Sequence, residues 1–263
     1  MGKNSWQLSV AAGFVSTVFY LTLFLFTYAK CSTDPRIGQP EIKSLVTIST
    51  HITHMINFTL TPPQRAAVRR QRSHPFRFLM DQPQEFDRVY AWSSWADATQ
   101  LHRIHPTARS VIDIGCGQAG VAAIQNIVYG MEVYLIDGAR EGQRDAGYES
   151  ADSMNHYSTW SDLPSTLKGW GCDMSRVHFV EIDSAQRYPW GGVDLVQSLH
   201  SCGAHYPIST YNWLYDRVNH SGTLYSFVIS DAAAAEIPRE FELVHTVPMI
   251  NYPHLKHRVL RRG

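Results

Sequence analysis

The stretch S-V-I-D-I-G-C-G-Q-A-G, residues 110–120, decides the fold. Its first part, residues 111–114, is a short run rich in β-branched residues, as a buried strand of a parallel sheet requires. Gly115, Gly117 and Gly120 follow with the spacing G-x-G-x-x-G. The first two glycines allow a tight turn and the close approach of a ligand, and the third allows the next helix to pack closely on the sheet. The stretch therefore predicts a strand, a ligand-binding loop and a helix.

The residues that follow extend this pattern. Residues 121–129 have helical spacing, and Gly130 is expected to end that helix in the left-handed conformation. Residues 131–138, M-E-V-Y-L-I-D-G, predict a second strand that ends at Asp137, and 137 − 113 = 24 residues separate this acid from Asp113. An acid at the tip of the second strand, roughly 20 residues on, can hold the two hydroxyls of a ribose. The pattern therefore indicates an adenosine-containing ligand.

Asp113, two residues before the first glycine, distinguishes between cofactors. In a dinucleotide site the loop holds a pyrophosphate at a helix amino terminus, where an acid has no evident task. A carboxylate suits a cationic amino-acid tail better. The segment D-I-G-C-G resembles the first motif of the class I S-adenosylmethionine-dependent methyltransferases, D/E-x-G-x-G-x-G. Asp113, Gly115 and Gly117 match that motif, and the third glycine stands at Gly120 in place of Ala119.

The resemblance covers residues 106–263 and implies a Rossmann-like α/β fold, a seven-stranded methyltransferase sheet with flanking helices. It also implies S-adenosyl-L-methionine as the cofactor. Apolar runs occur in the order that this family requires. Further strands are expected at 177–183, 192–201, 222–229, 241–249 and 257–262, with a helix at 208–219. The last two strands would form the antiparallel pair that closes the family's sheet.

The resemblance also implies which residues contact the cofactor. They lie in the glycine loop or at the carboxyl ends of the predicted strands, where open α/β sheets bind their ligands. In the family, a residue after the third strand commonly contacts the adenine amino group. The implied contacts are Asp113, Gly115, Gly117, Asp137, Asp183, Ser184 and Ser198.

The exit of the fourth predicted strand, S-L-H-S-C-G-A-H-Y-P at 198–207, is unusually polar. It resembles a stretch S-x-x-S-W-G-x-H-Y-P of proteins described as sugar O-methyltransferases, with Cys202 in place of the tryptophan. Histidine can act as a base near neutral pH. His205 and His200 are therefore the candidate catalytic bases, although either could simply cap a loop or pack on a neighbour. These residues predict O-methylation of a small molecule, sugar or glycan hydroxyl.

Other functions stay open at this point. The arginine-rich segment at 65–77 could serve an RNA or protein acceptor or contact lipid headgroups, although a solvated helix face explains it as well. The chain has 23 Lys+Arg and 23 Asp+Glu, so no net charge favours nucleic acid. The N-P-P-Y type motif of base amino-group methylation is absent. A non-catalytic binding module and a dehydrogenase that binds NAD are further alternatives, and no metal site is expected.

The amino-terminal segment accounts for the low charged fraction of 17 %. Trp6 to Ala29 contains no ionisable acid or base, and these 29 − 6 + 1 = 24 residues exceed the roughly 20 needed to cross a bilayer. We expect an uncleaved single-pass anchor, with a cleaved signal peptide as the alternative because residues 27–29 resemble a cleavage site. Lys30, Arg36 and Lys43 follow the segment and place the remaining chain in the cytoplasm.

The chain therefore divides into three predicted regions. Residues 1–30 form the transmembrane anchor, 31–105 a linker and accessory helical region, and 106–263 the cofactor-binding domain. Within the middle region, residues 85–104 read as a helix that leads into the domain. Its aromatic residues, Tyr90 among them, are interpreted as packing residues.

Overall fold

A computed structural model describes residues 59, 83–137, 162–199, 201–202, 207–231, 233–248 and 255–263. All of them lie in one compact unit, His51–Gly263. The predicted anchor at 6–29 and the arginine-rich segment at 65–77 lie outside the described residues. Among the helices that are described, none has the length and apolar character needed to cross a membrane. The three predicted regions stay a prediction.

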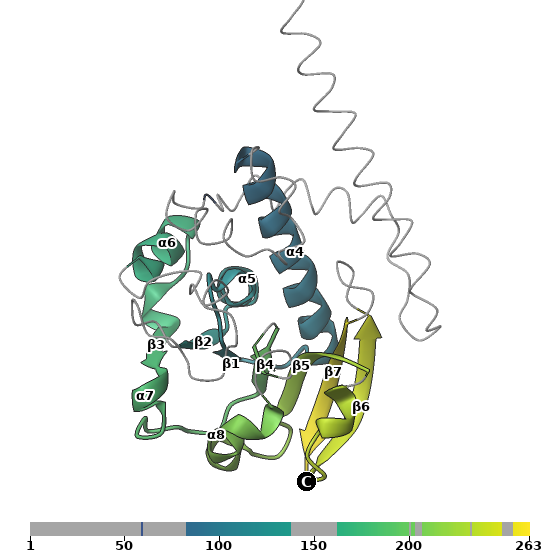
Figure 1. The fold of residues 1–263 in the computed structure, drawn as a ribbon. Coiled ribbons are helices and arrows are strands. Elements are labelled where there is room, and N and C mark those ends of the chain that lie inside the picture. Colours follow the sequence, from purple (N-terminus) through teal and green to yellow (C-terminus); the bar gives the residue numbers. More distant parts are fainter. Residues whose placement is uncertain are drawn as a thin grey trace, which may run out of the picture. The chain divides into compact units, whose positions relative to one another are not determined.

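A seven-stranded sheet with the order β3-β2-β1-β4-β5-β7-β6 forms the centre of this unit (Figure 1). Strands β1 to β5 are parallel to one another, and β7 is antiparallel to both β5 and β6. The prediction of a Rossmann-like seven-stranded sheet with a closing antiparallel pair is confirmed. The strands are β1 (Ser110–Ile114), β2 (Glu132–Asp137), β3 (Val177–Glu181), β4 (Leu195–Ser198), β5 (Leu224–Ser230), β6 (Phe241–Pro248) and β7 (Leu255–Arg262).

Helices cover both faces of the sheet (Figure 1). On one side lie α4 (Pro83–Ile104), α5 (Gly120–Tyr129) and α6 (Leu163–Trp170). On the other lie α7 (Ile182–Ala185) and α8 (Asn212–Val218). Short 3-10 turns complete the described part: η2 (Met174–Arg176), η3 (Ile208–Tyr211) and η4 (Ala233–Glu236).

The alternation of side chains along β1 separates the core from the candidate site. Ile112 and Ile114 are fully buried in the apolar cluster that α8 covers, together with Leu214 and Tyr215. Because successive side chains of a strand point to opposite faces, Asp113 emerges on the other face, toward α4 and α5. The β-branched residues of the strand thus bury one face, and a carboxyl group faces the second layer of helices.

Several element boundaries differ from the predicted ones. The third strand ends at Glu181, and residues 182–185 form a helical turn in which the Ser184 hydroxyl donates to the Glu181 carbonyl oxygen at 3.0 Å. The predicted helix at 208–219 begins as the 3-10 turn η3. The end of α5 is as expected, since Gly130 has φ +60° and its N–H donates to the Asn126 carbonyl oxygen at 3.0 Å.

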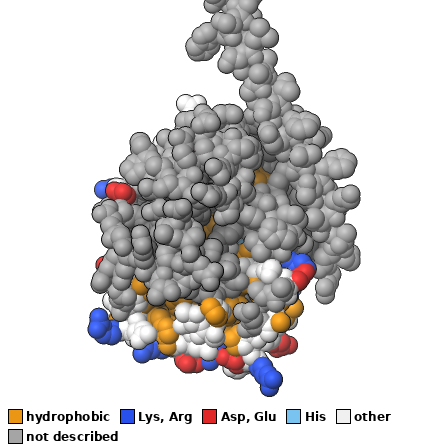
Figure 2. All heavy atoms as spheres, viewed as in Figure 1, with side chains coloured by type: hydrophobic (Ala, Val, Ile, Leu, Met, Phe, Trp, Pro, Cys, Tyr) orange, Lys and Arg blue, Asp and Glu red, His pale blue; other side chains and the backbone are white. Residues whose placement is uncertain are grey.

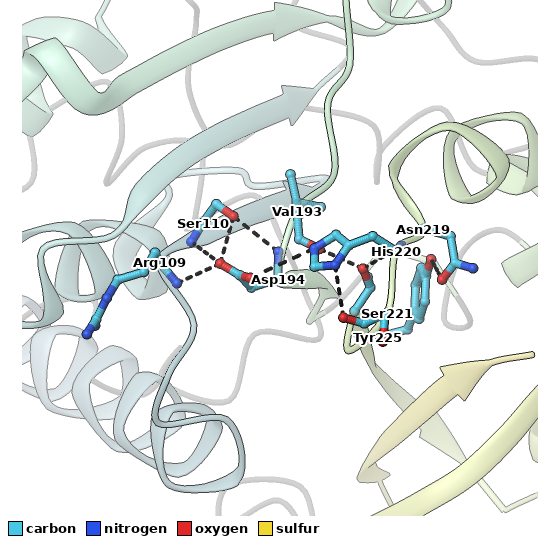
Figure 3. A network of polar contacts seen from close by, with 9 residues as sticks. Arg109, Ser110, Val193, Asp194, Asn219, His220, Ser221 and Tyr225 are labelled. Carbon is cyan, nitrogen blue, oxygen red and sulfur yellow. Dashed lines mark hydrogen bonds and ion pairs between the residues drawn. The ribbon is translucent and has the colours of Figure 1, made fainter.

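The ends of β1 and β4 away from the glycine loop are joined by the carboxylate of Asp194 (Figure 3). Its Oδ2 accepts hydrogen bonds from the Arg109 N–H at 2.7 Å and from the Ser110 N–H and hydroxyl, both at 3.0 Å. Burial acts to raise the pKa of Asp194, but these hydrogen bonds hold it below its usual value. These hydrogen bonds join β1 to β4 at one end, and the candidate site lies at the opposite end of the two strands.

Candidate cofactor site

The loop between β1 and α5 has left-handed backbone at several positions. Gly115 has φ +68° and Gly117 has φ +54°, which glycine adopts without steric cost. Ala119 has φ +54° as well, and it is the one residue other than glycine with positive φ in the described part of the chain. Ala119 stands where the methyltransferase motif has its third glycine. The loop thus keeps the backbone of that motif although the side chain costs roughly 1–2 kcal/mol.

Gly115 is in close contact with the chain that leaves β4. A Cβ atom at Gly115 would lie 2.3 Å from Cβ and 2.5 Å from Oγ of Ser201. The polar exit of β4 therefore lies directly against the glycine loop. No side chain fits at Gly115 without displacing Ser201.

Gly120 has a different role from the predicted one. A Cβ atom there would lie 2.4 Å from the Ser94 Oγ and 2.6 Å from the Tyr90 Oη, both on α4. The third glycine thus allows α5 to approach a second helix, and the prediction that it serves packing on the sheet was wrong. The Tyr90 hydroxyl accepts a hydrogen bond from the Gly120 N–H at 3.2 Å. Tyr90 belongs to the site, which the sequence did not indicate, because α4 brings it there from 30 residues away.

The backbone N–H groups of the loop donate mainly to oxygens of the protein itself. Gly115 and Cys116 donate to the Ile136 carbonyl oxygen at 2.7 and 3.3 Å, and Gly117 donates to the Asp137 Oδ2 at 2.8 Å. Ala119 donates to the carbonyl oxygen of Cys116 at 2.7 Å. Together with the Tyr90 bond at the start of α5, these bonds occupy the donors that would hold a pyrophosphate in a dinucleotide site.

Asp113 is the most deeply buried acid of the loop region, with 3 % of its surface exposed. Burial raises its pKa to about 7, the amide of Gln197 opposes the rise, and the negative charge of Asp137 adds to it. A carboxyl group in this state gains most from a ligand that brings a positive charge. Asp113 is therefore suited to a cationic group and unsuited to a phosphate.

Asp137 lies at the carboxyl end of β2, beside the glycine loop. Besides the Gly117 N–H, its Oδ2 contacts the thiol of Cys116, whose Sγ lies 3.9 Å away. Burial raises the pKa of Cys116 well above its usual value, with the charges of Asp137 and Asp113 adding to the shift. The thiol therefore stays protonated and acts as a small packing group and not as a nucleophile.

The other predicted site residues have the following positions. The Ser198 hydroxyl is buried; it donates to the Ile114 carbonyl oxygen at 2.9 Å and accepts from the Cys202 N–H at 2.8 Å, which shapes the exit of β4. Ser184 and the backbone of Asp183 lie in α7, just after β3. The candidate bases His200 and His205 lie outside the described residues. The structure thus brings together Asp113, Gly115, Gly117 and Asp137.

No group of three or more His, Cys, Asp or Glu side chains suited to a metal ion occurs within the described ranges. Parallel strands in the order 3-2-1-4-5, an antiparallel β7 beside β5, and a glycine loop after β1 with acids at the ends of β1 and β2 are now established. This seven-stranded arrangement with its glycine loop agrees with the Rossmann-like sheet that the resemblance to the class I methyltransferases implies.

Three solved structures illustrate what this chain is similar to. TrmN from Thermus thermophilus has 15 % identity over 63 % of this chain and 48 % of its own, with a TM-score of 0.43. The ribosomal protein L11 methylase from Lactobacillus delbrueckii subsp. bulgaricus has 14 % identity over 66 % of this chain and 77 % of its own, with a TM-score of 0.43. MtNAS in complex with MTA and tNA has 12 % identity over 93 % of this chain and 98 % of its own, with a TM-score of 0.46.

The present chain thus spans about half the length of TrmN. No family model matches the sequence, and no curated protein matches it.

Proposed function

We propose that this class I fold serves an S-adenosylmethionine-dependent methyltransferase. The observation that carries the proposal is the state of the glycine loop. Its N–H groups at Gly115, Cys116, Gly117, Ala119 and Gly120 already donate to protein oxygens, and the carboxyl groups of Asp113 and Asp137 face it. A diphosphate would meet few free donors and two acids there, whereas a sulfonium cofactor with an amino-acid tail meets complementary charge.

The residues present fit this cofactor. Asp113 would bind the ammonium group of the amino-acid tail, because it is a buried carboxyl group among acids. Asp137 would accept hydrogen bonds from the ribose hydroxyls at the end of β2, and Gly115 and Gly117 would let the cofactor approach the backbone. When bound, S-adenosylmethionine supplies an activated methyl group. The protein then needs only to align the acceptor and to remove its proton.

The acceptor that we propose is a hydroxyl group of a small molecule, sugar or glycan. The support comes from the resemblance of residues 198–207 to sugar O-methyltransferases and from the contact of Ser201 with Gly115, which lies beside the proposed cofactor loop. His205 or His200, in this same segment, would accept the hydroxyl proton, since imidazole titrates near neutral pH. The proton would leave through the imidazole to solvent.

The acceptor is tested by incubating the full chain with methyl-labelled S-adenosylmethionine and a host extract, followed by mass spectrometry. We expect the label in a small-molecule or glycan fraction as an alkali-stable methyl ether. His205→Gln or His200→Gln should lower turnover while cofactor affinity stays within about twofold, because a base acts on the acceptor. Label recovered in RNA or in protein would contradict the hydroxyl acceptor and favour one of the alternatives.

The distribution of charge over the described part of the surface does not favour a nucleic-acid acceptor. Over the described part of the face in Figure 2, basic and acidic side chains are interspersed with apolar ones. A nucleic-acid surface would carry clustered Lys and Arg residues. An acceptor affinity that falls steeply with salt would argue for RNA, and a salt-insensitive affinity supports the neutral acceptor that we propose.

We also propose that Trp6 to Ala29 anchors the protein in a membrane, with the methyltransferase domain on the cytoplasmic side. The support is the length of this uncharged segment and the basic residues that follow it. The full chain should then stay in the membrane fraction after extraction at alkaline pH. Release of the intact chain into the supernatant would contradict an uncleaved anchor.

A further inference from the structure

A row of buried polar side chains crosses the sheet on the face that α4 and α5 cover. Asp113 of β1 is in register with Gln197 of β4, and Gln197 is in register with Ser226 of β5. They are 3 %, 0 % and 0 % exposed. The row continues to His257 of β7, whose Nδ1 lies 3.5 Å from the Ser226 Oγ and whose Nε2 lies 3.4 Å from the Asp97 Oδ1 of α4. Polar groups this deep are costly, so their presence calls for a function.

Gln197 is held in one orientation by a second buried amide. The Gln125 Nε2 of α5 donates to the Gln197 Oε1 at 2.8 Å. This bond uses the oxygen of Gln197 and leaves its Nε2 buried without a hydrogen bond of normal geometry among the described residues. Asp113, the register partner of Gln197 on β1, lies on this same face, and the Gln197 amide favours its ionised form.

We propose that Gln197, held by Gln125, is a positioning residue that orients the Asp113 carboxyl group and couples cofactor uptake to the loss of its proton. The inference rests on the proposed function, because it assumes that Asp113 binds the cofactor's ammonium group. In the absence of a ligand, burial favours the protonated form of this carboxyl group. On binding, that proton goes to solvent, and the carboxylate is stabilised by the ammonium group on one side and the Gln197 Nε2 on the other.

The groups that face Asp113 support this coupling. They are Asp137 of β2, Cys116 of the loop and Tyr90 of α4, and none of them is a cation. His257 and Asp97 stand at the far end of the polar row. Burial raises the pKa of Asp113 to about 7 in these surroundings. The cofactor therefore supplies the positive charge that the described surroundings of Asp113 lack, and the amide supplies a hydrogen bond that the ionised form accepts more strongly than the protonated form.

The test is the affinity of the full chain for S-adenosylmethionine measured between pH 5.5 and 8.5. Below the Asp113 midpoint, affinity should fall about tenfold per pH unit, because one proton must leave for each cofactor bound. Titrations in buffers of different ionisation enthalpy should detect that released proton. Above about pH 8 affinity should fall again as the cofactor's own amino group loses its charge. That alkaline limb is an internal reference, since it belongs to the ligand.

Variants of the two amides separate a positioning role from a merely structural one. Gln197→Met, similar in shape but without a donor, should move the acid midpoint up by about one pH unit and leave the alkaline limb in place. Gln125→Met should move it in the same direction by less. The matched control is Asn126→Ala, which removes another buried amide of α5, bonded to the Met131 carbonyl oxygen at 3.0 Å and to the Asp173 N–H at 2.8 Å.

The control should lose stability and keep the wild-type midpoint. A wild-type affinity that is flat from pH 5.5 to 7.5 would overturn the inference and leave the proposed function standing. So would an unmoved midpoint in Gln197→Met, or, if that variant does not fold, in Gln125→Met. Absence of cofactor binding by the wild-type chain at every pH would overturn the proposed function, and the inference with it.

Discussion

At the scale of single residues, the backbone conformation of the glycine loop and its close neighbours limit which residues fit there. Gly115 has positive φ and touches Ser201, so both its conformation and its surroundings require glycine. Ala119 adopts a similar φ without glycine. Asp113 is buried at a cost, and its carboxyl group faces the place where we put the cofactor's charge. Single substitutions at Gly115 and Asp113 should therefore change stability and cofactor binding in predictable directions.

Gly115→Ala should destabilise the fold more than Gly130→Ala. Both positions have positive φ, +68° and +60°, so each substitution costs roughly 1–2 kcal/mol from the backbone alone. At Gly130 the nearest atom to a new Cβ is the Arg176 Nη1 at 3.6 Å, which is ordinary contact, whereas Gly115 must displace Ser201. Urea unfolding measures the difference. Equal losses in the two variants would contradict the described contact between the loop and the β4 exit.

Asp113→Asn should stabilise the cofactor-free chain and abolish cofactor binding. A carboxyl group whose pKa is raised by folding, here from 3.8 to about 7, destabilises the fold as pH rises between those values. The gain of the variant should therefore grow by about 1.36 kcal/mol per pH unit in that window, to at most about 4 kcal/mol above it. Unfolding curves at pH 5 and pH 8 measure this. A variant that is less stable than wild type at pH 8 would argue against the buried, raised carboxyl group.

At the scale of elements, α4 completes the site from outside the predicted domain. It contacts the glycine loop through Tyr90, α5 through the Thr99 Oγ1, which accepts from the Tyr129 hydroxyl at 3.0 Å, and β7 through the Asp97–His257 pair. The helices α4 and α5 are thus joined at both ends of α5. The helix that was expected to lead into the domain thus contacts the loop of the candidate cofactor site.

Two tyrosines allow this role of α4 to be tested with matched variants. Tyr90→Phe and Tyr129→Phe each remove one hydroxyl group that joins α4 to α5, and each should cost about 1 kcal/mol of unfolding free energy. Only Tyr90→Phe frees the Gly120 N–H of the loop, so only this variant should also weaken S-adenosylmethionine binding, by roughly threefold to tenfold. Calorimetric titration measures both. Equal cofactor affinities in the two variants would show that the Tyr90 hydroxyl of α4 does not contribute to cofactor binding.

At the scale of the whole molecule, the sheet and half of the site could be predicted from the sequence. The apolar runs and the glycines at 115, 117 and 130 predicted the strands along the chain and the loop, because buried parallel strands and left-handed turns have local signatures, and the family resemblance implied the seven-stranded sheet. Asp113 and Asp137 could be placed together because they end adjacent parallel strands. The contacts of Tyr90 and Ser201 with the loop could not be predicted from the sequence, since each depends on how two distant elements pack.

The contact between the buried amides of Gln125 and Gln197 could not be predicted from the sequence for the same reason. Nothing in the local sequence shows that Gln125 and Gln197 meet, because 72 residues separate them and only the packing of α5 on β4 joins them. A polar residue in an apolar strand is visible in the sequence, but its partner is not. The meeting of Gln125 and Gln197 therefore becomes visible only in the folded chain.

We propose that this loop binds a cationic adenosine cofactor and not a dinucleotide. The most direct measurement is the thermal unfolding of the full chain at pH 7.5 with S-adenosylmethionine or NAD. S-adenosylmethionine at about 100 times its Kd should stabilise the native state by about 2.7 kcal/mol and raise Tm, and Asp113→Ala or Asp137→Ala should abolish the shift. NAD should leave Tm unchanged. A shift with NAD and none with S-adenosylmethionine would show that the loop binds a dinucleotide.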